Sequence, residues 1–137
     1  MRTLNETQCI TLLEATKADR AFLAARMAGS IDARTAGWLA HEVQNKNLNV
    51  TTLLDRAGTK LGAIWWWFSP TNKSLVLNAG ASFVKTDTTP AFLQAYELLA
   101  KQCGAVSMEF QTARAGVVRI YQRAGWTVEG VAMRKFL

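Results

Sequence analysis

Residues 118–126 read VRIYQRAGW, and this stretch decides the fold. Its apolar side chains recur at helical spacing, and Gly125 is the type of residue that commonly ends a helix. The pattern predicts a helix over residues 113–124. Residues 126–137 are rich in apolar side chains and predict further strand structure. A helix that stops at a glycine before a strand is typical of a chain that alternates helices with strands.

The segments upstream continue this alternation. Thr16 and Asp19 have the spacing of a capping box, which predicts that a helix starts after a first strand. A later helix is expected to be capped by Thr89, to carry Pro90 in its first turn and to stop at Gly104. The expected strands are residues 9–15, 49–56, 61–68, 75–84, 105–111 and 126–137. The expected helices are residues 17–28, 30–44 (with its start at Ser30 or Asp32), 90–103 and 113–124.

This order, β-α-α-β-β-β-α-β-α-β, predicts an α/β fold: one mixed central sheet with a three-stranded antiparallel meander, flanked by helices. Residues 61–68, LGAIWWWF, are apolar on both faces, as a central strand would be. Alternation places Trp66 on one face and Trp65 and Trp67 on the other, and we expect core packing for all three. The alternative is an aromatic wall of an acceptor pocket, a partner interface or a stacking surface for single-stranded nucleic acid. Gly80 is a candidate bulge. The buried face of the strand at 105–111 is expected to comprise Val106, Met108 and Phe110.

Composition bounds the class of protein. The chain has 137 residues, of which 50% are hydrophobic and 19% charged, which indicates one globular domain rather than a disordered chain. It contains no apolar run long enough for a membrane span and no signal peptide, so we expect a cytoplasmic protein. Cys9 and Cys103 are expected to be reduced thiols. With His41 as the only histidine, we expect no metal site.

The charge favours an anionic partner without choosing one. The formal net charge is +6 and the pI about 9.8, which suits nucleic acid, a phosphorylated cofactor or an acidic protein surface. The Lys and Arg residues are scattered, with no block of five or six like charges. A domain that is basic without a specific anionic partner is an equally good reading of the charge alone.

Two segments and the order of elements resemble the GCN5-related N-acetyltransferase (GNAT) family. Residues 12–19, LLEATKAD, resemble the strand and helix start with which these enzymes open. The VRIYQRAGW stretch resembles the family's Ala-x-x-Leu-Tyr-x-x-x-Gly-Phe signature, with Ile120 and Tyr121 for Leu-Tyr and with Gly125 and Trp126 for Gly-Phe. The resemblance implies the acyl-CoA N-acyltransferase fold and transfer of an acetyl group from acetyl-CoA to an amine.

A third segment, residues 84–93, lies where the family carries its cofactor motif, Arg/Gln-x-x-Gly-x-Gly/Ala. Lys85 falls on the first position, Thr88 on the first glycine and Pro90 on the second, so both glycines are replaced. In the family this loop presents backbone N–H groups to a pyrophosphate at a helix N-terminus. Thr88 keeps its N–H but adds a Cβ, and Pro90 has no N–H. The cofactor-binding residues that the resemblance implies are Val84, Lys85, Thr88, Thr89, Arg114 and Arg119.

The resemblance also implies catalytic residues. Tyr121 stands where the family often has the acid that protonates the departing thiolate. A core tyrosine, with its apolar ring packed on the sheet, is the alternative reading. The third meander strand contains no carboxylate, so Glu109 on the next strand is the nearest candidate base. A solvated surface glutamate is the alternative there.

Three functions follow from these features. The first is an active acetyl-CoA-dependent N-acyltransferase acting on an amine of a protein or a small molecule. The second is a catalytically degenerate relative that binds a host protein or serves as a structural module of a virion, since size and divergence favour a phage origin. It would lie in the host cytoplasm or in the virion. The third is nucleic-acid binding, which ranks below the others. The partners considered are an amine acceptor, a host protein and a second copy in a homodimer, and no membrane.

Overall fold

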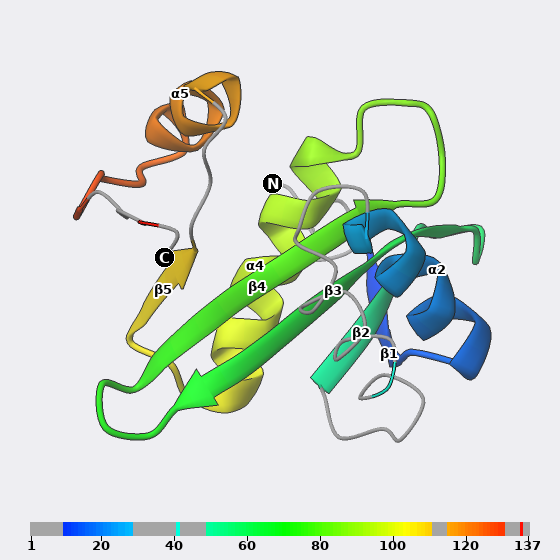
Figure 1. Ribbon diagram of the computed structural model, residues 1–137, viewed down its shortest axis with the longest axis horizontal. Coiled ribbons are helices and arrows are strands. Elements are labelled where there is room, and N and C mark those ends of the chain that lie inside the picture. The colour runs from blue at the N-terminus through cyan, green and yellow to red at the C-terminus, as the bar shows by residue number, and fades with distance from the viewer. Residues whose placement is uncertain (1–9, 29–40, 42–48, 111–114, 131–134, 136–137) are drawn as a thin grey trace, which may run out of the picture.

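The computed structural model describes residues 10–28, 41, 49–110, 115–130 and 135 (Figure 1). The strands are β1 (Thr11–Glu14), β2 (Asn49–Leu54), β3 (Lys60–Ser69), β4 (Ser74–Ser82) and β5 (Ser107–Phe110). The helices are α2 (Lys17–Ala28), α4 (Thr89–Cys103) and α5 (Ala115–Arg123). Apart from His41, the helix predicted at 30–44 lies outside the described residues. Residues 126–130 are not strand, so the last predicted strand is wrong there.

The strands form one sheet in the order β1-β2-β3-β4-β5. Pairing is antiparallel from β1 to β4 and parallel between β4 and β5. Because a parallel neighbour needs a crossover connection, α4 lies between β4 and β5 in the chain. The mixed sheet with its antiparallel meander therefore confirms the predicted α/β fold class.

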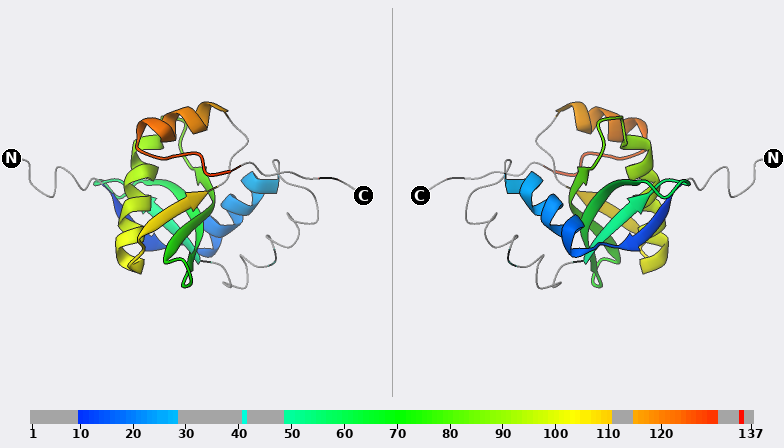
Figure 2. Two further views of the ribbon diagram at one scale, coloured as in Figure 1. Left: turned by 90° about the vertical axis from the view of Figure 1, so that its left-hand side faces the viewer. Right: turned by 90° about the vertical axis from the view of Figure 1, so that its right-hand side faces the viewer.

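Helices pack on both faces of the sheet (Figure 2). On one face, α4 buries Phe92 and Leu99 in a cluster with Leu53, Ile64 and Leu75 of the sheet. On the other face, a smaller cluster contains Leu23 of α2 together with Val50, Ala63 and Ala81. The sheet is thus the middle layer of three, as the apolar character of both faces of residues 61–68 predicts.

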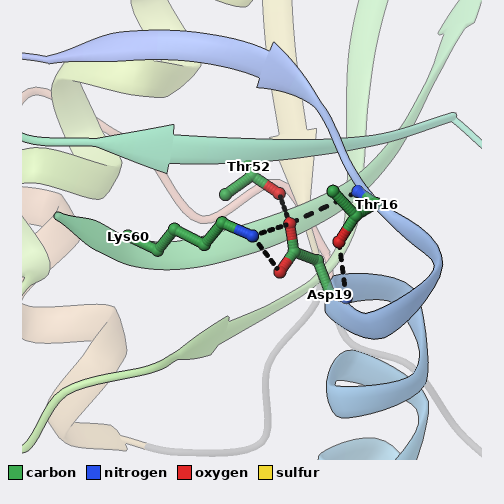
Figure 3. Close-up of polar contacts among 4 residues, drawn as sticks. All are labelled: Thr16, Asp19, Thr52 and Lys60. Atoms are coloured by element: carbon green, nitrogen blue, oxygen red, sulfur yellow. Dashed lines mark hydrogen bonds and ion pairs between the residues drawn. The ribbon is translucent and has the colours of Figure 1, made fainter. Parts of the chain in front are cut away.

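The start of α2 confirms the predicted capping box. The Thr16 N–H donates to Asp19 Oδ2 at 3.3 Å, and the Asp19 N–H donates to Thr16 Oγ1 at 3.1 Å. Asp19 also binds the sheet: Thr52 Oγ1 donates to Oδ2 at 2.8 Å, and Lys60 Nζ lies 2.9 Å from Oδ1 (Figure 3). One buried carboxylate therefore caps the helix and ties it to β2 and β3.

The ends of α4 lie at or within one residue of the predicted positions. The helix begins at Thr89, with Thr88 at the cap position and a proline in the first turn. The cap is one residue earlier than expected, because the Asp87 side chain and not that of Thr89 accepts a helix N–H. Gly104 ends the helix in the left-handed region at φ 71°, as predicted.

The bulge in β4 lies at Asn78 and not at Gly80. Trp65 pairs with Ala79 and Trp66 with Leu77, so Asn78 has no partner on β3. Gly80 is instead needed for close packing, because a Cβ there would lie 3.1 Å from Phe92 Cε1. A β-bulge also shifts the side-chain alternation by one residue.

Two apolar residues are more exposed than predicted. Trp67 is 46% exposed and Val106 is 76% exposed, whereas Trp66 packs on the α4 side of the sheet and Trp65 on the α2 side. Val106 precedes the first residue of β5, so strand alternation does not reach it. In the described part of the chain, no helix is both long and apolar enough to cross a membrane.

Candidate functional site

A cleft opens where β4 and β5 stop pairing. Among the described residues, the last pair of the parallel ladder is Leu77 with Phe110, and β4 continues beyond it to Ser82. The bulge at Asn78 follows this last pair at once, and bulges bend and twist the strand that contains them. α5 lies beyond the end of β5 (Figure 1). The space between β4, α4 and α5 is a cavity of about 360 Å³, which we call the β4–α5 cleft.

The inner wall of the cleft is a strand edge. The Phe83 N–H donates to the Leu61 carbonyl on β3 at 2.9 Å. Successive backbone groups of a strand point to opposite edges, so the N–H and C=O groups of Ser82 and Gly80 point away from β3. That edge faces the cleft, beyond the last β5 pair. It can pair with the amide groups of an extended ligand as a further strand would.

The opposite wall carries a pair of tyrosines. Tyr121 of α5 donates a hydrogen bond to the hydroxyl of Tyr96 of α4 at 3.2 Å, and both residues line the cleft. The Tyr121 ring packs against Phe110 and Trp126, with centroids 4.5 and 5.3 Å away. Burial raises the pKa of Tyr121, and the hydrogen bond with Tyr96 opposes part of that rise. Burial raises the pKa of Tyr96 as well. Both hydroxyls therefore stay protonated at neutral pH.

At its outer end the cleft meets the N-terminus of α4. Thr88 and Thr89 line it there. The Thr89 N–H donates to Asp87 Oδ1 at 3.0 Å, and the Phe92 N–H donates to the Thr88 carbonyl at 3.0 Å. Hydrogen bonds from the Thr89 backbone and side chain lower the pKa of the exposed Asp87 carboxyl. An ionised carboxylate of the chain itself thus occupies a helix N-terminus that would otherwise attract an external anion.

The structure brings together only some of the sequence-predicted site residues. Tyr121, Thr88 and Thr89 line the β4–α5 cleft, whereas Lys85 and Arg119 are exposed and do not line it. Arg114 lies outside the described residues.

Val84 and Glu109 are engaged elsewhere. Val84 forms a tight turn with Ser82, whose hydroxyl donates to the Val84 carbonyl at 2.7 Å. Glu109 points to the face of β5 opposite Phe110 and accepts a hydrogen bond from Ser74 Oγ at 3.2 Å. Because alternate residues of a strand face opposite ways, Glu109 does not enter the cleft beside Tyr121.

Sequence reasoning missed Tyr96, Asp87 and the free edge of β4. Tyr96 reads as a core residue at helical spacing, and Asp87 as a loop residue, although an Asp two residues before a Thr-Pro helix start is a recognisable capping signal.

The bulge in β4 gives no signal in the sequence, because apolar residues occupy the odd positions without a break: Leu75, Leu77, Ala79, Ala81 and Phe83. Across the bulge these positions change from the α4 side to the α2 side of the sheet.

No protein-family model matches the sequence, and no curated protein sequence matches it. Solved structures do match. A protein from Pyrococcus furiosus classed as an acetyltransferase superposes with a TM-score of 0.68 at 13% identity, over 93% of this chain and 99% of that one. The ribosomal-protein-alanine N-acetyltransferase from Brucella melitensis biovar Abortus 2308 superposes with a TM-score of 0.62 at 10% identity, over 93% and 99%.

A third neighbour was solved with a ligand. The enzyme AAC(6')-Iy, in complex with the bisubstrate analog CoA-S-monomethyl-acetylneamine, superposes with a TM-score of 0.62 at 10% identity, over 95% of this chain and all (100%) of that one. At these identities the likeness shows the fold. The chain has the GNAT acetyltransferase fold, as the VRIYQRAGW stretch and the order of elements predicted.

Proposed function

We propose that this protein is an N-acyltransferase that binds an acyl thioester in the β4–α5 cleft and transfers the acyl group to an amine of a protein or a small molecule. One observation carries the proposal: Gly80 and Ser82, whose edge of β4 pairs with no described residue of β5, line the same cleft as Tyr121. The edge can hold an extended amide-containing arm, and the hydroxyl can give a proton to the group that leaves.

Acyl transfer from a thioester requires a proton for the sulfur that leaves. The neutral amine attacks the thioester carbonyl, the new C–N bond forms and the C–S bond breaks. The thiolate takes the Tyr121 proton, and the proton released by the amine returns to the tyrosine through solvent. Tyr121 suits this role because its raised pKa keeps the proton in place until the sulfur needs it. Hydroxyls rotate, so Tyr96 can donate to Tyr121 while the Tyr121 proton points into the cleft.

Acetyl-CoA is the acyl donor that the fold implies, and it would supply an activated acetyl group. Its two ends fit this chain differently. The amide-containing arm fits the free backbone edge of Gly80 and Ser82. The diphosphate does not fit the start of α4, where Asp87 holds the Thr89 N–H and Pro90 offers none.

The same misfit supports a second candidate function, a non-catalytic module that keeps the fold to bind a host protein. It differs from the first in a measurable way, because a module of this kind turns over no thioester. The Brucella melitensis neighbour is a ribosomal-protein-alanine N-acetyltransferase. AAC(6')-Iy was solved with an acetylneamine bisubstrate analog. We therefore choose an α-amino peptide and an aminoglycoside as the first acceptors to assay.

The test compares Tyr121→Phe with Tyr96→Phe. Each variant loses the same tyrosine–tyrosine hydrogen bond, so their losses of stability should be similar. Only Tyr121→Phe removes the proposed acid, and we expect kcat to fall about 100-fold or more with KM little changed, against a fall of less than about tenfold for Tyr96→Phe. Mass spectrometry of the acetylated amine gives the rate. The wild-type rate should rise with pH as the acceptor amine loses its proton, and it should not fall before about pH 10, since burial raises the pKa of Tyr121 above its ordinary value.

Equal and small losses in the two variants would show that Tyr121 is a structural residue. Undetectable acetylation by the wild type with either acceptor, from acetyl-CoA and from acetyl-pantetheine alike, would favour the non-catalytic module.

A further inference from the structure

Among the residues that the structure describes, those that line the β4–α5 cleft carry no charge. From β4, β5 and α5 they carry aliphatic, aromatic, amide or hydroxyl side chains with backbone groups between them, and Phe92 and Tyr96 of α4 continue that surface. A cavity of about 360 Å³ is near the lower end of the range for ligand pockets, about 300–1,000 Å³. Its size and polarity suit a thin, neutral arm with a few amides better than a whole nucleotide thioester.

A carboxylate lies next to the part of the lining that comes from the start of α4. Asp87 is exposed beside Thr88 and Thr89, and its carboxylate is fixed by the Thr89 N–H at 3.0 Å. The carboxylate offsets the partial positive charge at the N-terminus of α4 and repels a second anion there. Pro90 removes another backbone donor from the same turn. Lys85 lies two residues before Asp87, and neither residue is in the lining of the cleft.

Building on the acyl transfer proposed above, we infer that the β4–α5 cleft takes an acyl-pantetheine thioester that carries no nucleotide diphosphate, and that Asp87 sets this preference. The arm gains its affinity from the strand edge at Gly80 and Ser82 and from the apolar walls. A diphosphate adds no affinity, because Asp87 holds the Thr89 N–H, Pro90 has no N–H, and the Asp87 carboxylate repels a second anion. Acetyl-CoA then binds no better than its pantetheine arm alone.

Titration calorimetry with acetyl-CoA and with S-acetyl-pantetheine tests this preference, at about 50 mM salt so that screening is weak. Asp87→Asn removes the charge and keeps a side-chain oxygen for the Thr89 N–H. The matched control is Asp55→Asn, because Asp55 makes the same kind of turn contacts, to the Ala57 and Thr59 N–H groups at 2.9 Å, and does not line the cleft.

For the wild type we expect the two thioesters to bind within about threefold of each other. Asp87→Asn should tighten acetyl-CoA binding about five- to tenfold and leave acetyl-pantetheine unchanged, while Asp55→Asn changes neither. Circular dichroism should show the same fold for all three proteins.

Two results would overturn the inference. Wild-type binding of acetyl-CoA more than tenfold tighter than acetyl-pantetheine, unaltered by Asp87→Asn, would show that the diphosphate is recognised, and the proposed acyl transfer would stand. If neither thioester binds any of the three proteins, the donor preference and the proposed function fall together.

Discussion

Substitution of Asp19 tests how much the hydrogen bonds between α2 and the sheet contribute to stability. Its carboxylate accepts hydrogen bonds from the Thr16 N–H, the Thr52 hydroxyl and the Lys60 ammonium group (Figure 3). Asp19→Ala removes the acceptor for all three. Loss of the helix cap costs about 1 kcal/mol. The Thr52 hydroxyl, in a residue only 1% exposed, is left without this acceptor at a cost of about 1–3 kcal/mol.

Lys60 adds little to this sum. Its side chain is 45% exposed, so the ammonium group can return to water when its partner is removed. The expected destabilisation is therefore about 3 kcal/mol, a large share of the roughly 5–15 kcal/mol by which domains are stable. Urea unfolding followed by tryptophan fluorescence should show a midpoint lowered by about 1.5 M. Asp19→Asn, which keeps an acceptor oxygen, and Lys60→Met should each cost about 1 kcal/mol.

The same carboxylate predicts a pH dependence. Burial alone would raise the pKa of Asp19, but hydrogen bonds from Lys60, Thr52 and Thr16 outweigh it, and the net pKa is lowered. A group whose folded pKa is depressed stabilises the fold above its unfolded pKa, about 4, and that stabilisation is lost as pH falls through the folded value. The stability difference between wild type and Asp19→Asn should thus be constant near neutral pH and shrink below about pH 4. A loss for Asp19→Ala no larger than that for Lys60→Met would refute this account of the network.

The remaining predictions concern glycines and use the same urea assay. Gly62→Ala should cost about 2–3 kcal/mol, because the new Cβ would lie 2.5 Å from the Ala81 carbonyl oxygen and 2.6 Å from Phe92 Cζ. Gly80→Ala, 3.1 Å from the Phe92 ring, should cost about 1 kcal/mol, and the opposite ranking would contradict the packing. Gly104→Ala meets no atom within 4 Å but holds φ at 71°, so it should cost about 1 kcal/mol; an unchanged midpoint would show that the backbone there relaxes.

Much of the fold could be predicted because its signals are local. The Thr16–Asp19 cap, the helix stop at Gly104 and the glycine after α5, with φ 97° at Gly125, depend on a few neighbouring residues and a required backbone angle. The residues of the candidate site were harder to predict from the sequence than the helices and strands. Tyr121 was found by resemblance, and it lines the cleft, whereas Glu109 was chosen by proximity in sequence and points to the other face of β5.

Although it wrongly predicted a strand at residues 126–130, the sequence by itself determined the helices and strands that the structure describes up to α5, the order in which they occur, and the family of folds in which that order is found. It did so because periodicity, caps and turn residues act over a few positions. Only the tertiary structure decided where β4 leaves β5, since the bulge at Asn78 arises from pairing with β3 and leaves the apolar alternation unbroken. Only it could show that the Tyr96 hydroxyl meets the Tyr121 hydroxyl, because that contact depends on packing between α4 and α5, which are distant in the chain.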